Sequence, residues 1–193
     1  CPTYAHTAPI QKMDGDSRRK LSKRKDMEAT MSYYFEQGYP PIVVKEYLMN
    51  LLNSKFEDWR RANLTLPLED YIFDPANVGN SGGLFDFVKL NHISSNIIAV
   101  MSAKDVAIAV LAWAEQYAPT FADRLKNNEN YCIQILNIER ERDVPRKDYA
   151  KWSDIESQIA FFFEDLFSEM KIEYAELLVP TQIDDAKKAL EIF

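Results

Sequence analysis

At 193 residues, with 47% hydrophobic and 27% charged side chains, the chain has the length and composition of a globular protein that can bury a core. No apolar run approaches the roughly 20 residues that a membrane helix needs, and the N-terminus lacks the basic start and apolar stretch of a signal peptide. A net charge of −7 argues at first against a nucleic-acid partner, because phosphate binding depends on Lys and Arg.

The N-terminal third is predicted to form a polar loop followed by two helices. Residues 8–25 hold many charged and turn-forming side chains without an apolar period, which is typical of a loop. Asp26 is expected to cap a helix over residues 27–37, which Gly38 ends. A second helix over residues 40–53 repeats its apolar side chains at helical spacing. Because the connection is short, the two helices are expected to form a hairpin.

The middle of the chain changes from irregular to regular structure. Residues 62–83 are rich in Pro and Gly and are predicted to form loops around one short helical turn. Helices are predicted next at residues 84–90, 93–100 and 103–117, and the last has a capping-box-like start at Ser102. We therefore place a domain boundary near this serine.

The C-terminal part is predicted to be helical as well. Helices are expected to begin at Pro119, to cover residues 129–140 and 153–170, and to begin again at Thr181, with Ser153 opening a capping box. Leu, Ala, Glu and Lys are abundant, the five glycines are few, and no alternating strand pattern occurs beyond a short segment near the N-terminus. The predicted fold class is all-α.

The thiols and imidazoles give no pattern of a metal site. Cys1 and Cys132 fit a reducing compartment better than a disulfide scaffold, so a cytoplasmic protein is expected. Neither cysteine has a second ligand at metal-binding spacing, and His6 and His92 stand alone. We predict no bound metal.

The charge is distributed unevenly along the chain. The tail from Ser153 onward has ten acidic side chains and three lysines, so it carries the whole net charge of −7. Residues 12–25 hold seven basic side chains against two acidic ones. A second basic concentration consists of Arg140, Arg142, Arg146, Lys147 and Lys151. Two positive patches on an acidic body suit a protein that binds phosphates at chosen places, although solvated surface is the competing interpretation.

The sequence KLSKR at residues 20–24, here called the lysine loop, could bind a polyphosphate. Lys20 and Lys23 carry compact charges on flexible stems, which can follow phosphate oxygens during a displacement. The Ser22 hydroxyl could steady the loop or donate to a phosphate, and Leu21 could anchor the loop to apolar surface. A lysine-rich pentapeptide alone is weak evidence of this chemistry.

The surrounding residues make the pattern more specific. The lysine loop resembles the KMSKS signature of class I aminoacyl-tRNA synthetases, in the KLSKR form seen in glutamyl-tRNA synthetases. Residues 4–10 resemble the last strand of their catalytic domain, and residues 32–54 resemble the helices that follow the motif. Residues 84–91 resemble a further family segment. The similarity extends to about residue 154.

This resemblance implies a role for each residue of the lysine loop. Lys23 matches the lysine that contacts ATP phosphates, with Lys20 as its catalytic partner and with Ser22 and Arg24 as further ATP-binding residues. The parent enzyme, a glutamate–tRNA ligase, would use ATP with Mg²⁺ to activate glutamate and then transfer it to tRNA-Glu. No HIGH-like sequence occurs in the chain, so the fragment alone is expected to be catalytically inactive.

The resemblance also implies three parts. Residues 1–26 would end the catalytic domain, residues 27–101 would form a helical stem-contact region, and residues 102–193 would form an anticodon-binding helix bundle. Since the chain begins on Cys1 rather than Met, an internal fragment is expected. A monomer is expected.

The predicted RNA contacts lie in the second basic concentration. An anticodon is single-stranded, so its recognition relies on stacking and on hydrogen bonds to base edges. The side chains that offer this mixture are Arg140, Arg142, Arg146, Lys147, Lys151 and Trp152. For Trp152 a core position is an equally good interpretation, and Trp59 and Trp113 are expected to pack in the core.

Two other hypotheses use the same residues. The chain could be a freestanding RNA-binding module derived from such an enzyme, or a helical protein-interaction module that uses its acidic tail. Binding of tRNA-Glu separates the RNA-binding hypotheses from the protein-interaction module, because only RNA binding should weaken steeply with salt.

Overall fold

The computed structural model describes residue 4 and residues 6–177, with side chains described up to residue 170. Cys1 and the helix expected from Thr181 lie outside the described residues. The chain divides into two compact units between residues 154 and 155, and each unit is treated by itself. The predicted boundaries at residues 26 and 101 stay predictions.

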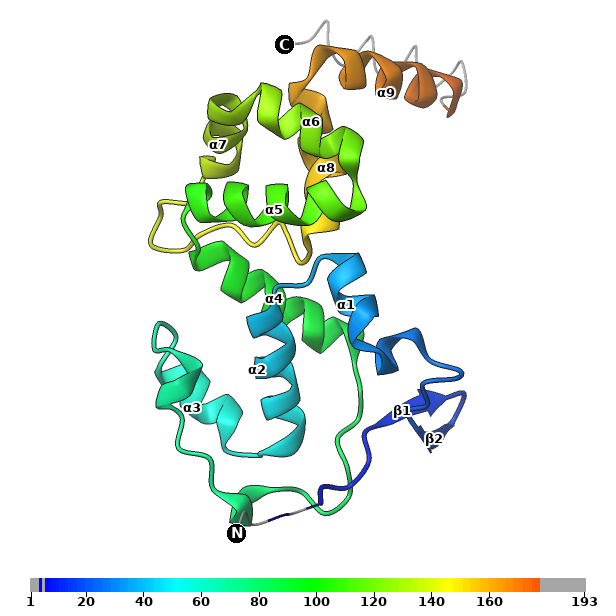
Figure 1. Cartoon of the computed structure of the whole chain (residues 1–193), viewed down its shortest axis with the longest axis vertical. Helices are drawn as coiled ribbons and strands as arrows, with labels where there is room; N and C mark the ends of the chain where they lie inside the picture. The colour runs from blue at the N-terminus through cyan, green and yellow to red at the C-terminus, as the bar shows by residue number, and fades with distance from the viewer. Residues whose placement is uncertain (1–3, 5, 178–193) are drawn as a thin grey trace, which may run out of the picture. The chain divides into compact units, whose positions relative to one another are not determined.

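Helices dominate the described residues, which confirms the all-α class. Short 3-10 turns lie at Met27–Ala29, Leu68–Asp70, Pro75–Asn77 and Ala160–Phe162. The α-helices are α1 (Met31–Gln37), α2 (Pro41–Leu52), α3 (Phe56–Ala62), α4 (Phe87–Val100), α5 (Ala103–Tyr117), α6 (Pro119–Asn127), α7 (Glu129–Asn137), α8 (Trp152–Ile159) and α9 (Glu164–Leu177) (Figure 1).

The N-terminal segment is a β-hairpin rather than the predicted loop. Strands β1 (Gln11–Asp14) and β2 (Ser17–Lys20) pair antiparallel, with Gln11 opposite Lys20. Gly15 has a φ of 59° in the tight turn between them, where a side chain would be strained. The end of the irregular stretch at residues 62–83 also holds β1 in place, because Gln11 N donates to Gly83 O at 2.9 Å. This partner lies far away in sequence, so local patterning gave no sign of it.

The helix expected over residues 27–37 is interrupted. A 3-10 turn at Met27–Ala29 precedes α1, and Asp26 makes no side-chain cap to it. The Asp26 carboxylate is engaged with basic side chains of the hairpin instead. Gly38 ends α1 in the left-handed conformation at φ 80°, as predicted.

The core of the N-terminal half forms where α2 packs against α4. Its buried side chains are Tyr34, Tyr39, Val43, Val44, Tyr47, Phe85 and Leu90. Helix α2 begins at Pro41 as expected, but its main partner is α4 rather than α1, so the predicted helical hairpin is replaced by this packing (Figure 1). Two helices were expected over residues 84–100, whereas α4 is continuous and is capped by Asp86, whose Oδ1 accepts from Val88 N at 2.7 Å.

Helices α5, α6 and α7 pack against one another. Ser102 caps α5 as predicted, accepting from Asp105 N at 3.1 Å. Helix α7 ends at Asn137, earlier than expected, and residues 138–151 form no regular element.

The predicted helix over residues 153–170 is divided into α8 and α9 by a 3-10 turn. Ser153 is not at the expected capping position, because α8 begins one residue earlier, at Trp152; the Ser153 hydroxyl donates to Gln37 O at 2.8 Å. The Asp154 carboxylate accepts instead from the backbone N–H of Lys151 at 3.0 Å and of Ala150 at 3.2 Å.

Candidate functional site

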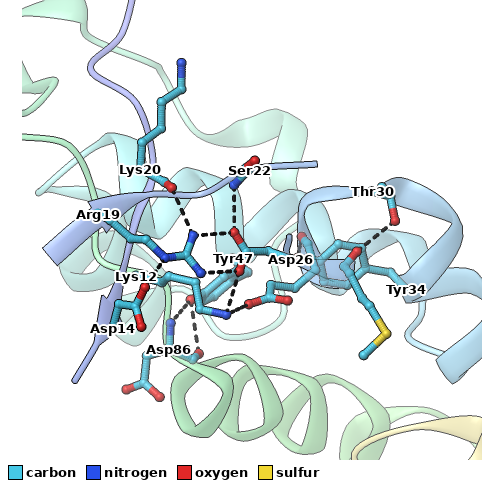
Figure 2. A network of polar contacts seen from close by, with 12 residues as sticks. Lys12, Asp14, Arg19, Lys20, Ser22, Asp26, Thr30, Tyr34, Tyr47 and Asp86 are labelled. Carbon is cyan, nitrogen blue, oxygen red and sulfur yellow. Dashed lines mark hydrogen bonds and ion pairs between the residues drawn. The ribbon is translucent and has the colours of Figure 1, made fainter. Parts of the chain in front are cut away.

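The lysine loop is organised by the buried carboxylate of Asp26, which is only 4% exposed. Arg19 reaches both of its oxygens, from Nη1 to Oδ2 and from Nη2 to Oδ1, each at 2.7 Å. Ser22 N donates to Oδ2 at 2.8 Å, and Lys12 Nζ lies 3.1 Å from Oδ1. Figure 2 shows these groups converging on the one carboxylate from the hairpin and from the loop.

Two further acids complete this network. Lys12 also donates to Glu28, which is 6% exposed, so its ammonium lies between two carboxylates. Arg19 Nε contacts Asp14 Oδ2 at 2.6 Å at the outer end of the hairpin. Tyr34 OH donates to the backbone oxygen of Glu28 at 2.6 Å, which ties α1 to the same place.

The charges of the network stabilise one another. The hydrogen bonds from Arg19 are the main reason that the pKa of the Asp26 carboxyl lies far below its usual range. The same contact raises the pKa of Arg19, and the hydrogen bonds to Glu28 and Asp26 raise the pKa of Lys12. All three groups are therefore ionised at neutral pH.

The backbone of the lysine loop is fixed at both ends. Leu21 N donates to Ile10 O at 2.9 Å, and the half-buried Leu21 side chain fits its predicted anchoring role. Lys25 N and Asp26 N both donate to Ser22 O, at 3.0 and 2.8 Å, which closes a tight turn. Ser22 thus holds this turn through its backbone N–H and C=O groups, and the role of its hydroxyl toward a phosphate stays a prediction.

The remaining cations of the loop face solvent. Lys20, Lys23 and Arg24 are exposed, and in the part of the chain that the structure describes no carboxylate lies within 4 Å of any of them. Lys20 and Lys23 line one open groove of about 490 Å³, and in Figure 2 the Lys20 ammonium points away from the Asp26 network. The apolar wall of the groove includes Tyr34, Val44, Tyr47, Leu48 and Phe85.

Sequence reasoning therefore missed the organising residue of the site. Arg19 and Lys12 had been counted among the basic residues of a phosphate-binding patch, whereas both are paired with carboxylates. The available signal was an aspartate four residues after Ser22, at the end of the basic run. It was interpreted as a helix cap, because Asp before an apolar helical pattern usually has that role.

In the second basic concentration, Arg140 is turned inward. Its guanidinium Nη1 donates to Ile98 O at 2.6 Å and to Met101 O at 3.1 Å, where α4 ends. Its Nε donates to Leu136 O at 2.9 Å. Burial lowers the pKa of Arg140. This arginine thus donates to carbonyl groups at the ends of α4 and α7, where intrahelical donors run out.

Arg142, Arg146 and Lys147 are exposed. Arg142 lies 2.9 Å from Glu139, and Arg146 lies 3.6 Å from Glu139 and 3.0 Å from Asp148. Glu139 has a φ of 56°, in the left-handed region, near the start of the irregular segment at residues 138–151. Ion pairs this exposed are weak, so other anions can compete for the two arginines.

Lys151 and Trp152 support the end of α1. Trp152 is 6% exposed, and its backbone N–H donates to Gly38 O at 2.9 Å. Lys151 Nζ lies 6.0 Å from the centre of the Tyr39 ring and 3.6 Å from Asp154. The structure therefore does not place Arg140, Trp152 and the exposed cations on one common surface, and the RNA-contact role of all six residues stays a prediction.

The other two tryptophans are half-buried and pack within the protein. Trp113 Nε1 donates to Phe35 O at 3.0 Å, at the end of α1. Trp59 lies 5.1 Å from Tyr71, between ring centres, and the Arg60 guanidinium lies 4.8 Å from its ring centre.

No metal-binding group of three His, Cys, Asp or Glu occurs within the described ranges. Cys132 is buried, and burial raises the pKa of its thiol. Among the helices that the structure describes, none is long and apolar enough to cross a membrane.

Comparison with known proteins gives relatives along the whole chain. No protein-family model matches it. A glutamate–tRNA ligase of Clostridium beijerinckii is 42% identical over 192 residues, which cover 100% of this chain and 35% of the relative. One of Acetivibrio thermocellus is 38% identical over 100% of this chain and 34% of the relative. One of Sorangium cellulosum is 37% identical over 86% of this chain and 32% of the relative. The chain thus spans about a third of the length of these relatives.

Proposed function

We infer, from homology to glutamate–tRNA ligases along the whole chain, that these residues form the C-terminal, tRNA-binding part of such a ligase and carry its ATP-contacting lysine loop. The observation that carries this proposal is the 41–42% identity over 192 residues with relatives of that one name. The exposed lysines of the loop supply the matching chemistry.

The proposed reaction of the parent enzyme has two steps. A carboxylate oxygen of glutamate attacks the α-phosphorus of ATP, which forms glutamyl-adenylate and releases pyrophosphate. A hydroxyl at the 3′ end of tRNA-Glu then takes the glutamyl group and releases AMP. Mg²⁺ accompanies ATP in the first step.

The lysine loop would act in the first step. Lys23 would contact the phosphates and stabilise the charge that builds up as pyrophosphate leaves, and Lys20, which lines the same groove, would assist. Arg24 would add positive potential at the exposed edge of the loop, and Ser22 would hold its backbone. Among the described residues no carboxylate lies within 4 Å of Lys20 or Lys23, and Glu28, which also lines the groove, is paired with Lys12; both observations support this assignment.

The exposed cations of the irregular segment would bind tRNA. We propose Arg142, Arg146 and Lys147 as direct RNA contacts, because all three are exposed. Arg140, Lys151 and Trp152 would support this surface through their contacts within the protein. Residues 27–101 would contact the tRNA stem, and residues 102–193 would bind the anticodon region.

Two measurements on the isolated chain test this function. Binding of tRNA-Glu in a gel shift should weaken steeply as salt rises, because each phosphate contact releases counterions. Lys104→Ala, which removes an exposed lysine on α5, is the matched control for Lys147→Ala and should have the smaller effect. Absence of binding at low salt would remove the RNA-binding function and favour the protein-interaction alternative.

The second measurement is ATP–pyrophosphate exchange. We propose that the 193 residues alone do not form glutamyl-adenylate, because they contain no HIGH-like sequence. Exchange should appear only when the chain is part of the longer ligase. Rapid exchange by the isolated chain would refute this part of the proposal. We also propose that the protein is cytoplasmic and monomeric.

A further inference from the structure

We propose that Asp26 is a positioning residue for the lysine loop, and that it sets the place of Lys23 without touching ATP itself. The proposal rests on the proposed function of the loop in ATP binding. Its basis is the geometry of the Asp26 carboxylate, in which one oxygen binds the loop backbone and both oxygens bind the hairpin (Figure 2).

Asp26 and Ser22 hold each other reciprocally. Asp26 Oδ2 accepts from Ser22 N at 2.8 Å, and Asp26 N donates to Ser22 O at 2.8 Å. These two hydrogen bonds join the two ends of the turn at residues 22–26. Lys23 directly follows Ser22, whose backbone N–H and C=O are both held. The backbone that carries Lys23 is therefore fixed by a side chain that no ligand needs to contact.

Arg19 and Lys12 hold the carboxylate in turn. Arg19 binds it through two parallel N–H contacts, which fix the orientation of the carboxylate plane. Lys12 approaches the same oxygen as Arg19 Nη2 and is shared with Glu28. Because Lys12 lies in β1 and Arg19 in β2, their contacts with Asp26 attach the loop to the hairpin and restrict its movement.

The same contacts divide the basic run by role. Asp26 is buried and paired with Arg19 and Lys12, so it should repel an incoming phosphate less than an exposed, unpaired carboxylate would. Lys20 and Lys23 have no such carboxylate among the described residues, and both line the groove. An anionic ligand is consequently directed to these two lysines.

The test uses the complete ligase that contains this chain, with Asp26→Asn as the main variant. Asn keeps the size of the side chain but loses the charge and half of the bidentate contact with Arg19. We expect adenylate formation to slow about 30-fold at saturating ATP, since small misplacement of a reacting group can cost up to about 100-fold. The KM for glutamate and the Kd for tRNA-Glu should stay within about twofold.

Asp14→Asn is the matched control. Asp14 contacts the same arginine, at 2.6 Å from Nε, and its replacement removes the same charge, but it makes no contact with Ser22. Its effect on adenylate formation should be less than about threefold. Equal losses in the Asp14 and Asp26 variants would overturn the proposal.

A double-mutant cycle separates positioning from general structural damage. If Asp26 acts through Lys23, the Lys23→Ala, Asp26→Asn double variant should be no slower than Lys23→Ala alone, because the positioned group is already gone. Multiplicative losses would contradict the proposal.

A measurement on the isolated chain separates failure of this proposal from failure of the proposed function. Asp26→Asn should speed hydrogen exchange of the Ser22 amide at least tenfold relative to Asp14→Asn, and unchanged exchange would overturn the positioning role. If Lys23→Ala leaves adenylate formation in the ligase unchanged, the proposed ATP function is wrong, whatever the exchange at Ser22.

Discussion

The lysine loop and the irregular segment at residues 138–151 look alike in sequence, since each is a run of basic residues beside a helix, but they are held in different ways. Next to the loop, in β2, Arg19 points to the buried carboxylate of Asp26. In the segment, Arg140 points to the carbonyl groups at the end of α4. In both places one arginine stabilises the fold and its neighbours face solvent, so a count of basic residues overestimates the phosphate contacts.

The two regions differ in how firmly the solvent-facing cations are placed. The loop backbone is closed by hydrogen bonds between Ser22 and Asp26, so the main chain that carries Lys23 is held in place. Arg142 and Arg146 are restrained by ion pairs at the surface, and such pairs contribute only about 0.2–1 kcal/mol each. A preset group suits transition-state stabilisation, whereas adjustable arginines suit a flexible single strand of RNA.

The largest effect is expected at Lys23 in the lysine loop. In the complete ligase, Lys23→Ala should slow adenylate formation about 100-fold, the size typical for loss of one group that stabilises developing charge. Rapid quench with tRNA-Glu at saturating concentration measures the step. Lys25→Ala, an exposed neighbour outside the groove, is the control and should change the rate little. An unchanged rate for Lys23→Ala would remove the assigned role.

The next effect concerns the packing of the end of α1 against the start of α8. Gly38 ends α1 at φ 80°, and a Cβ there would lie 2.9 Å from Trp152 Cβ. Gly38→Ala should therefore destabilise the chain by about 2 kcal/mol in urea unfolding, through backbone strain and this clash. Gly79→Ala is the control, because open space surrounds that position. Equal stabilities would show that the end of α1 and Trp152, the first residue of α8, are not tightly packed.

A smaller effect distinguishes the two kinds of arginine. Arg140→Ala removes the guanidinium donors to Ile98 O and Met101 O at the end of α4 and to Leu136 O, and should cost about 1.5 kcal/mol of unfolding free energy. Arg142→Ala removes only an exposed ion pair and should cost less than about 0.5 kcal/mol. The comparison fails if both variants unfold at the same urea concentration.

The smallest effect is a dependence on pH. The folded-state pKa of Asp26 lies below its unfolded value of 3.8, so its ionised form contributes stability above that value. This contribution is lost as pH falls below about 4 toward the folded-state pKa. The stability difference between the wild-type chain and Asp26→Asn should stay constant from pH 8 to 5 and shrink only in acid. A difference that changes near neutral pH would point to another titrating group.

Local signals in the sequence predicted much of the helical frame. Ser102 and its partner Asp105 placed the start of α5 correctly, and Gly38 placed the end of α1, because capping depends on residues within one turn. The hairpin was missed because β1 is partly held by residues near Gly83, far along the chain.

The sequence predicted the motif of the candidate site but not the contacts that hold the lysine loop in place. KLSKR identified the exposed lysines from their resemblance to a known signature. Asp26 was assigned to a local cap, which lost to the stronger charged contact with Arg19. The partners of Arg140 at the end of α4, residues 98, 99 and 101, lie about 40 residues earlier, and no pattern in the sequence connects them.

The central claim is that the two basic regions bind different ligands. It is tested most directly by the affinity of the isolated chain for tRNA-Glu, measured at two salt concentrations. Arg142→Ala with Lys147→Ala should weaken binding about tenfold or more and lower the salt dependence, since two phosphate contacts are lost. Lys20→Ala with Lys23→Ala should leave the affinity within about twofold. Equal losses for the two pairs, or no change for the first, would contradict the claim.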